Sequence, residues 1–116
     1  MFQGDNEFSN IRVRKRLKVY HTDLDRIYEE FSEATYHRKE ELKDQLKALL
    51  GTLAGEKERA ERFCKTGTEQ AMYIPALDEA INFLSKVFDD SVQTPTSGCI
   101  YDAMFSIEYY LDDTET

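Results

Sequence analysis

The chain has 116 residues, 41% of them hydrophobic and 12% aromatic, so one core is feasible and a disordered chain is excluded. Its net charge of −8 argues against a nucleic-acid binder, which normally carries a large basic face. Residues 1–10 lack the apolar run of a signal peptide, and no stretch is long enough to cross a bilayer. We therefore expect one cytoplasmic domain over residues 1–116, with residues 1–8 disordered or partly derived from a tag.

Charge is divided unevenly along the chain. Residues 69–116 carry ten carboxylates and a single base, Lys86, whereas residues 1–68 carry 13 acids and 14 bases. A small domain with this distribution presents one strongly negative face, which attracts a positively charged partner and repels nucleic acid and anionic lipid. We expect a basic protein partner, no direct contact with nucleic acid and no membrane association.

Glycine and proline are scarce, and alternation of β-branched residues is nearly absent, so the predicted elements are helices. The first helix starts at Ser9 or Asn10 and carries a basic run from residue 12 to residue 18. Thr22 predicts a second helix start, although the two segments can also form one continuous helix. A turn is predicted at residues 35–39, where the apolar stripe lapses.

A leucine-rich helix follows this turn, with one apolar face made of Leu42, Leu46, Leu49, Leu50 and Leu53. Gly51 and Gly55 predict either its end or a close helix–helix contact, because glycine costs about 1 kcal/mol relative to alanine inside a helix. Residues 56–63 continue as a charged helical turn or two and stop at residues 65–67.

Pro75 predicts the first turn of the next helix, whose apolar positions are Ile74, Leu77, Ala80, Ile81, Leu84, Val87 and Phe88. Residues 94–98 form a loop, and the last helix starts at Ser97 or Gly98. It directs Ile100, Ala103, Met104, Ile107 and Leu111 inward. The predicted fold is all-α, a compact antiparallel bundle of four to five helices.

The last helix carries the candidate binding surface, because its second face holds aromatic side chains among carboxylates. Such aromatics are typical binding anchors, and acids at the rim supply electrostatic steering. The alternative is that Tyr101 and Phe105 pack under the N-terminal segment, or that this helix is central to the bundle. Together with two acids from the preceding turn, the predicted partner-binding residues are Asp89, Asp90, Tyr101, Asp102, Phe105, Glu108, Tyr109, Asp112 and Asp113.

No metal site or cofactor is predicted. His21 and His37 are the only histidines, and no His/Cys/carboxylate set has zinc spacing. Cys64 and Cys99 are expected to be buried and reduced, with a single bridge between them as the alternative. No catalytic set is apparent either, so the chain is predicted not to be an enzyme.

One short motif indicates a catalytic function instead. Arg16 and His21 are similar to the Arg-x4-6-His motif of HEPN ribonucleases, small helical bundles that dimerise to build an RNA-cleaving site. The resemblance implies that these two side chains act on the scissile phosphate and its 2′-hydroxyl. It covers six residues, and Leu17 stands where that family has a polar residue. An HEPN-like ribonuclease is therefore the remote alternative.

The predicted function is that of a small acidic protein that inhibits a basic partner by covering its active site. Immunity proteins that neutralise bacterial nuclease toxins, and phage-type anti-defence inhibitors, have this general character, although the analogy is one of class. The alternative is a structural or adaptor subunit that docks through the same helix onto a larger assembly. The basic run at residues 12–18 is expected to lie beside the acidic helices or in solvent.

Overall fold

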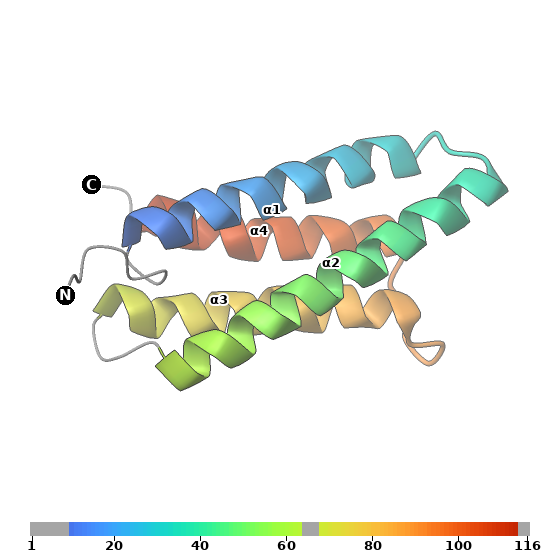
Figure 1. The fold of residues 1–116 in the computed structure, drawn as a ribbon. Helices are drawn as coiled ribbons and strands as arrows, with labels where there is room; N and C mark the ends of the chain where they lie inside the picture. The colour runs from blue at the N-terminus through green and yellow to red at the C-terminus, as the bar shows by residue number, and fades with distance from the viewer. Residues whose placement is uncertain (1–9, 64–67, 114–116) are drawn as a thin grey trace.

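A computed structural model describes residues 10–63 and 68–113. Over these residues the chain forms α1 (Asn10–Phe31), α2 (Tyr36–Phe63), α3 (Thr68–Ser85), the single 3-10 turn η1 (Lys86–Phe88) and α4 (Thr96–Asp113). The prediction of an all-helical bundle with four to five helices is confirmed for this part of the chain. In Figure 1 the chain runs from left to right along α1 and α3, and from right to left along α2 and α4.

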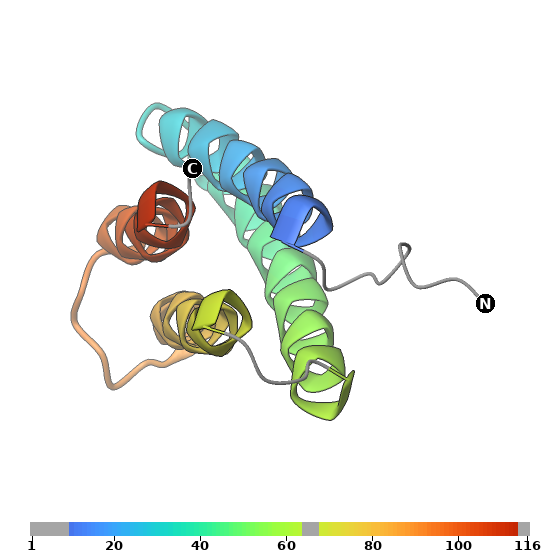
Figure 2. The same ribbon diagram turned by 90° about the vertical axis from the view of Figure 1, so that its left-hand side faces the viewer.

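The four described helices surround one core, and α1 and α2 pack against each other less closely than the other neighbours do. Viewed along the bundle, α1 and α2 lie on one side and α3 and α4 on the other, with α4 packed against both α1 and α3 (Figure 2). The pair α3 and α4 contains seven acidic residues and no basic residue, whereas α1 and α2 contain ten acids and 13 bases. The charge division along the sequence is therefore also a division between the two halves of the bundle.

The core is built from the apolar stripes of all four helices. Leu84 of α3 and Ile107 of α4, both predicted to face inward, are fully buried. Burial of each such side chain contributes roughly 1.5–3 kcal/mol. Tyr73 and Tyr110 are also buried, although the stripes did not predict them, and their rings lie 5.8 Å apart. The largest fully buried side chains are Tyr73, Leu17, Leu24, Ile27, Leu42, Leu46, Leu53, Leu77, Leu84, Ile100 and Ile107.

α1 is one continuous helix, which confirms the alternative to a second helix start at Thr22, and the Thr22 hydroxyl donates to the carbonyl of Lys18 at 2.9 Å instead of capping a new helix. Two other predicted boundaries are wrong. The turn lies at residues 32–35, earlier than predicted, because Thr35 caps α2: its hydroxyl accepts the Arg38 backbone N–H at 3.3 Å. The last helix begins at Thr96, one or two residues before the predicted start at Ser97 or Gly98.

Glycine and proline residues that were predicted to mark helix ends lie inside continuous helices. α2 runs through Gly51 and Gly55, and a Cβ built on either would meet nothing within 4 Å, so neither marks an end or a close contact. Pro75 lies in the middle of α3, which starts seven residues earlier. Its ring is exposed, and it cannot donate to the carbonyl of residue 71. Phe88, one of the apolar positions predicted for this helix, lies in η1 and is 40% exposed.

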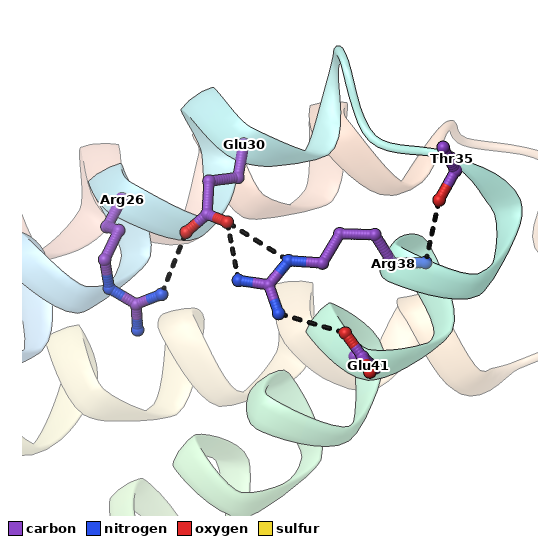
Figure 3. A network of polar contacts seen from close by, with 5 residues as sticks. All are labelled: Arg26, Glu30, Thr35, Arg38 and Glu41. Carbon is purple, nitrogen blue, oxygen red and sulfur yellow. Dashed lines mark hydrogen bonds and ion pairs between the residues drawn. The ribbon is translucent and has the colours of Figure 1, made fainter.

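A charged cluster spans the connection between α1 and α2 (Figure 3). Glu30 lies at its centre and accepts from Arg38 at 2.6 and 3.2 Å and from Arg26 at 3.2 Å. Arg38 also donates to Glu41 at 3.1 Å. The hydrogen bond from Arg38 lowers the pKa of Glu30 and raises that of Arg38 itself. The cluster links the last turns of α1 to the first turn of α2.

Candidate functional site

An acidic and aromatic groove lies between α3 and α4 on the outside of the bundle. It consists of two adjoining hollows of about 350 and 250 Å³ that share Glu79, Ser106 and Tyr109. We call the whole depression the α3–α4 groove. Its lining is Met72, Pro75, Ala76, Glu79 and Phe83 from α3 and Asp102, Phe105, Ser106, Tyr109, Tyr110 and Asp113 from α4.

The groove exists because small side chains line it between large ones. Ala76 and Ser106 are both buried at the α3–α4 contact, so they leave space that larger residues would fill. The Ser106 hydroxyl donates to the carbonyl of Asp102 at 3.2 Å, one turn back in the same helix. Its polar group is therefore satisfied within α4, and the hollows are mainly apolar in character.

Three aromatic rings on α4 keep much of their surface in solvent. Tyr101, Phe105 and Tyr109 are 54%, 52% and 62% exposed and follow one another at single-turn spacing. The rings of Phe105 and Tyr109 lie 6.2 Å apart, whereas Tyr101 lies 5.9 Å from Tyr28 of α1. Because each of these residues is more than half exposed, the other described helices do not cover this face of α4, although α4 packs against both α1 and α3 on its buried face.

The groove is lined by acids alone among the charged side chains of the described residues. Glu79 contributes from α3, and Asp102 and Asp113 contribute from α4. Lys86, the sole base after residue 68, has its Nζ atom 5.0 Å from the ring centre of Phe83. This cation–π contact shows that a lysine is accommodated against the aromatic lining.

Two predicted binding residues lie on the other side of α4, in a separate hollow of about 520 Å³ between α1 and α4. Glu108 and Asp112 line it together with Arg14, Lys18, His21, Thr22 and Leu111. The Glu108 carboxylate is 3.0 Å from His21 Nε2. Arg14 donates to the carbonyl of Leu111 at 2.6 Å, near the C-terminal end of α4. Part of the basic run thus lies beside an acidic helix, as predicted.

Asp89 and Asp90 follow η1, in the connection to α4, and neither lines the groove. The Asp89 carboxylate accepts the backbone N–H and the hydroxyl of Ser91 at 2.9 and 2.7 Å, and these hydrogen bonds lower its pKa. Asp89 therefore stabilises a turn. Of the nine predicted binding residues, the groove brings together Asp102, Phe105, Tyr109 and Asp113.

The α3 side of the groove was missed by the sequence reasoning. Met72, Ala76, Glu79 and Phe83 recur at intervals of three and four residues, so they share one helix face beside the core stripe. This second row of residues was the sequence signal that could have indicated the α3 side of the groove. Its position opposite α4 depends on tertiary packing, which the sequence pattern does not give.

Arg16 and His21 of the HEPN-like motif are not brought together. The Arg16 guanidinium contacts the buried carboxylate of Glu56 at 2.8 and 2.9 Å, whereas His21 contacts Glu108 on α4. Burial opposes the charge of Arg16, but the hydrogen bond and the charge of Glu56 raise its pKa. Tyr73 also donates to Glu56, and burial together with this bond raises the pKa of Tyr73 well above that of free tyrosine.

No group of three or more metal-ligating side chains occurs in residues 10–63 and 68–113. Within the same ranges, no helix is long and apolar enough to span a membrane. Cys99 is buried and carries a free thiol, whose pKa is raised by burial. Cys64 lies outside the described residues.

Comparison with known proteins found nothing similar: no protein-family model, curated protein or solved structure matches the chain.

Proposed function

We propose that this chain is a binding protein that captures a basic protein partner through the α3–α4 groove. The observation that carries the proposal is the combination of exposed Phe105 and Tyr109 with Glu79, Asp102 and Asp113 around two apolar hollows. Large exposed aromatics beside a hollow supply contact area, and a rim of one charge sign accelerates encounter with an oppositely charged surface. An arginine or lysine of the partner can meet both a carboxylate and an aromatic face.

The most specific form of the proposal is an inhibitor that acts in the cytoplasm and covers a basic active site. Immunity to a nuclease toxin and phage-type anti-defence are the two settings in which such a protein is expected. The support is the charge of the α3 and α4 pair, which has seven acids and no base. We also infer that the four helices pack antiparallel, because the chain reverses along successive helices (Figure 1).

An adaptor subunit is the second candidate, and the apolar character of the hollows favours it. A partner held mainly by apolar burial should stay bound at high ionic strength, whereas an electrostatically captured enzyme should lose association rate steeply. The two candidates therefore differ in salt dependence rather than in the surface used.

The test is capture of partners by the purified full chain from a lysate of its native cells, at low and high salt. Charge reversal at Asp102 and Asp113 should remove one stoichiometric basic partner at low salt. Asp25→Lys, on the exposed surface of α1, is the matched control and should leave capture unchanged. A partner that survives both high salt and charge reversal would contradict the inhibitor proposal and favour the adaptor; a partner bound equally by all variants would exclude the groove.

A further inference from the structure

We infer that the α3–α4 groove binds an amphipathic α-helix of its partner, with two large apolar side chains one turn apart and lysine or arginine residues beside them. The inference rests on the proposed function and names the element that enters the groove. Three features carry it: the period of the two hollows, the lack of a row of backbone partners in the groove, and the positions of the carboxylates.

The two hollows repeat with the period of a helix. On α4 the smaller hollow is lined by residues 102, 105, 106 and 109, and the larger by residues 106, 109, 110 and 113, a shift of four residues throughout. Four residues correspond to about 6 Å along a helix axis. Side chains at positions i and i+4 of a bound helix have this spacing, so each can enter one hollow.

In an extended segment, side chains on one face are separated by a similar distance, so the spacing of the hollows does not distinguish a bound helix from a bound strand. The hydrogen-bonding needs of the bound backbone do distinguish them. The groove walls are helices, whose N–H and C=O groups are paired along their own axes. Pro75 releases one acceptor, the carbonyl of residue 71, which is far less than the row of donors and acceptors that a strand requires. A strand docked here would leave its inner backbone groups unpaired, whereas a helix satisfies its own. The groove therefore favours the helix-in-groove mode of recognition.

The carboxylates determine the charge of that helix. Asp102 lines the smaller hollow, Asp113 lines the larger one, and Glu79 faces both from the α3 side. A bound helix with its apolar anchors in the hollows would place its flanking positions beside these acids, which favours lysine or arginine there. The rings of Phe105 and Tyr109 add cation–π acceptors, and the contact between Lys86 and Phe83 is an example within the chain.

The inference is tested by selection from two displayed peptide libraries against the full chain. Both contain peptides of about 15 residues, or about four helical turns. One has a helical alanine-rich frame in which two positions at i and i+4 and their flanks are randomised. The other has the same randomised positions in a proline-containing extended frame.

We expect binders from the helical library, with large apolar residues at both anchor positions and basic residues beside them. Their affinity should fall about tenfold or more in Phe105→Ala and in Asp102→Lys. It should be unchanged in Tyr36→Ala, because Tyr36 is 68% exposed at the start of α2 and lies outside the groove. Phe105 is itself half exposed, so circular dichroism should show that its variant remains folded.

The inference is overturned if binders come from the extended library alone, carry no basic residues, bind the Phe105 variant as well as the wild type, or do not emerge from either library. Its failure is distinguishable from that of the proposed function. If no helical peptide binds, but a lysate partner is still lost on charge reversal at Asp102 and Asp113, the basic partner stands and the helix does not. If helical peptides bind but no basic partner is captured from the lysate, the groove binds a helix and the proposed basic partner is wrong.

Discussion

Glu56 is the most consequential polar residue of the interior, and its removal gives the sharpest test of the packing. The carboxylate is 1% exposed and lies on α2, where it joins α1 to α3. It accepts hydrogen bonds from Arg16 Nε at 2.9 Å, from Arg59 at 3.0 Å and from the hydroxyl of Tyr73, and it forms an ion pair with Arg16 Nη2 at 2.8 Å. Tyr20 contributes a longer contact at 3.4 Å. We predict that Glu56→Ala strongly destabilises the fold.

The size of the stability loss in Glu56→Ala depends on the polar groups that remain without the carboxylate. Removal of one partner from a buried ion pair costs about 3–5 kcal/mol, because the remaining groups stay desolvated and unpaired. Here the side chains of Arg16 and Arg59 are 26% and 49% exposed, so both guanidinium groups can turn toward water. Tyr73 is fully buried and cannot. We therefore expect a loss at the lower end, about 3 kcal/mol, which lowers Tm by roughly 12 °C in a domain of this size.

The assay is urea and thermal unfolding followed by circular dichroism, with Glu58→Ala as the matched control. Glu58 is exposed on the same helix, so its removal should change the free energy of unfolding by less than about 0.5 kcal/mol. In a double-mutant cycle, Glu56→Ala and Arg16→Ala should be clearly non-additive. A Glu56→Ala protein within about 1 kcal/mol of the wild type would refute the reasoning, because it would mean that the carboxylate is not needed by its buried partners.

Three further predictions follow from burial, backbone and charge. Leu84→Ala should lower the free energy of unfolding by about 2–5 kcal/mol because Leu84 is fully buried, whereas Phe105→Ala should be nearly neutral in the same urea titration. Gly51→Ala should raise it by about 0.5–1 kcal/mol, since Gly51 lies inside α2 with open space around its Cβ; a destabilised variant would contradict that environment. In an NMR titration, Arg38→Ala should raise the pKa of Glu30 toward its ordinary value, because the hydrogen bond from Arg38 is the main cause of its lowered pKa. By linkage, the pair stabilises the fold above the ordinary glutamate pKa, and this stabilisation is lost as pH falls through the lowered pKa. An unchanged Glu30 midpoint would show that the pair does not form in solution.

Helical periodicity predicted the core well because it depends on residues that are close in sequence. Leu84 and Ile107 were assigned to buried faces from spacing alone, and both are fully buried. Residues that commonly mark helix ends predicted the helix boundaries less reliably. Thr22, Gly51 and Pro75 are common at helix ends, but here each lies within a continuous helix. Packing of long amphipathic faces against the core outweighs a local preference of about 1 kcal/mol for Gly51, and of about 3 kcal/mol for Pro75.

The sequence predicted only the α4 wall of the α3–α4 groove. The aromatic row of Phe105 and Tyr109 was visible in the sequence because its members share one helix with a separate core stripe. The opposite wall, with Glu79 and Phe83, comes from a helix about twenty residues earlier, and spacing within one helix cannot show which faces will meet. Glu108 was separated from this surface for the same reason: its contact with His21 depends on how α1 lies against α4.

The measurement that tests the central claim most directly is oxidative footprinting of the chain, free and in the complex captured from its native lysate. Hydroxyl radicals modify exposed aromatic and sulfur-containing side chains, so the groove carries its own reporters in Met72, Phe105 and Tyr109. The account predicts that these three lose reactivity in the complex while exposed Tyr36 stays unchanged. Undiminished oxidation of Phe105 and Tyr109, with protection confined to Tyr36 or to α1, would contradict it.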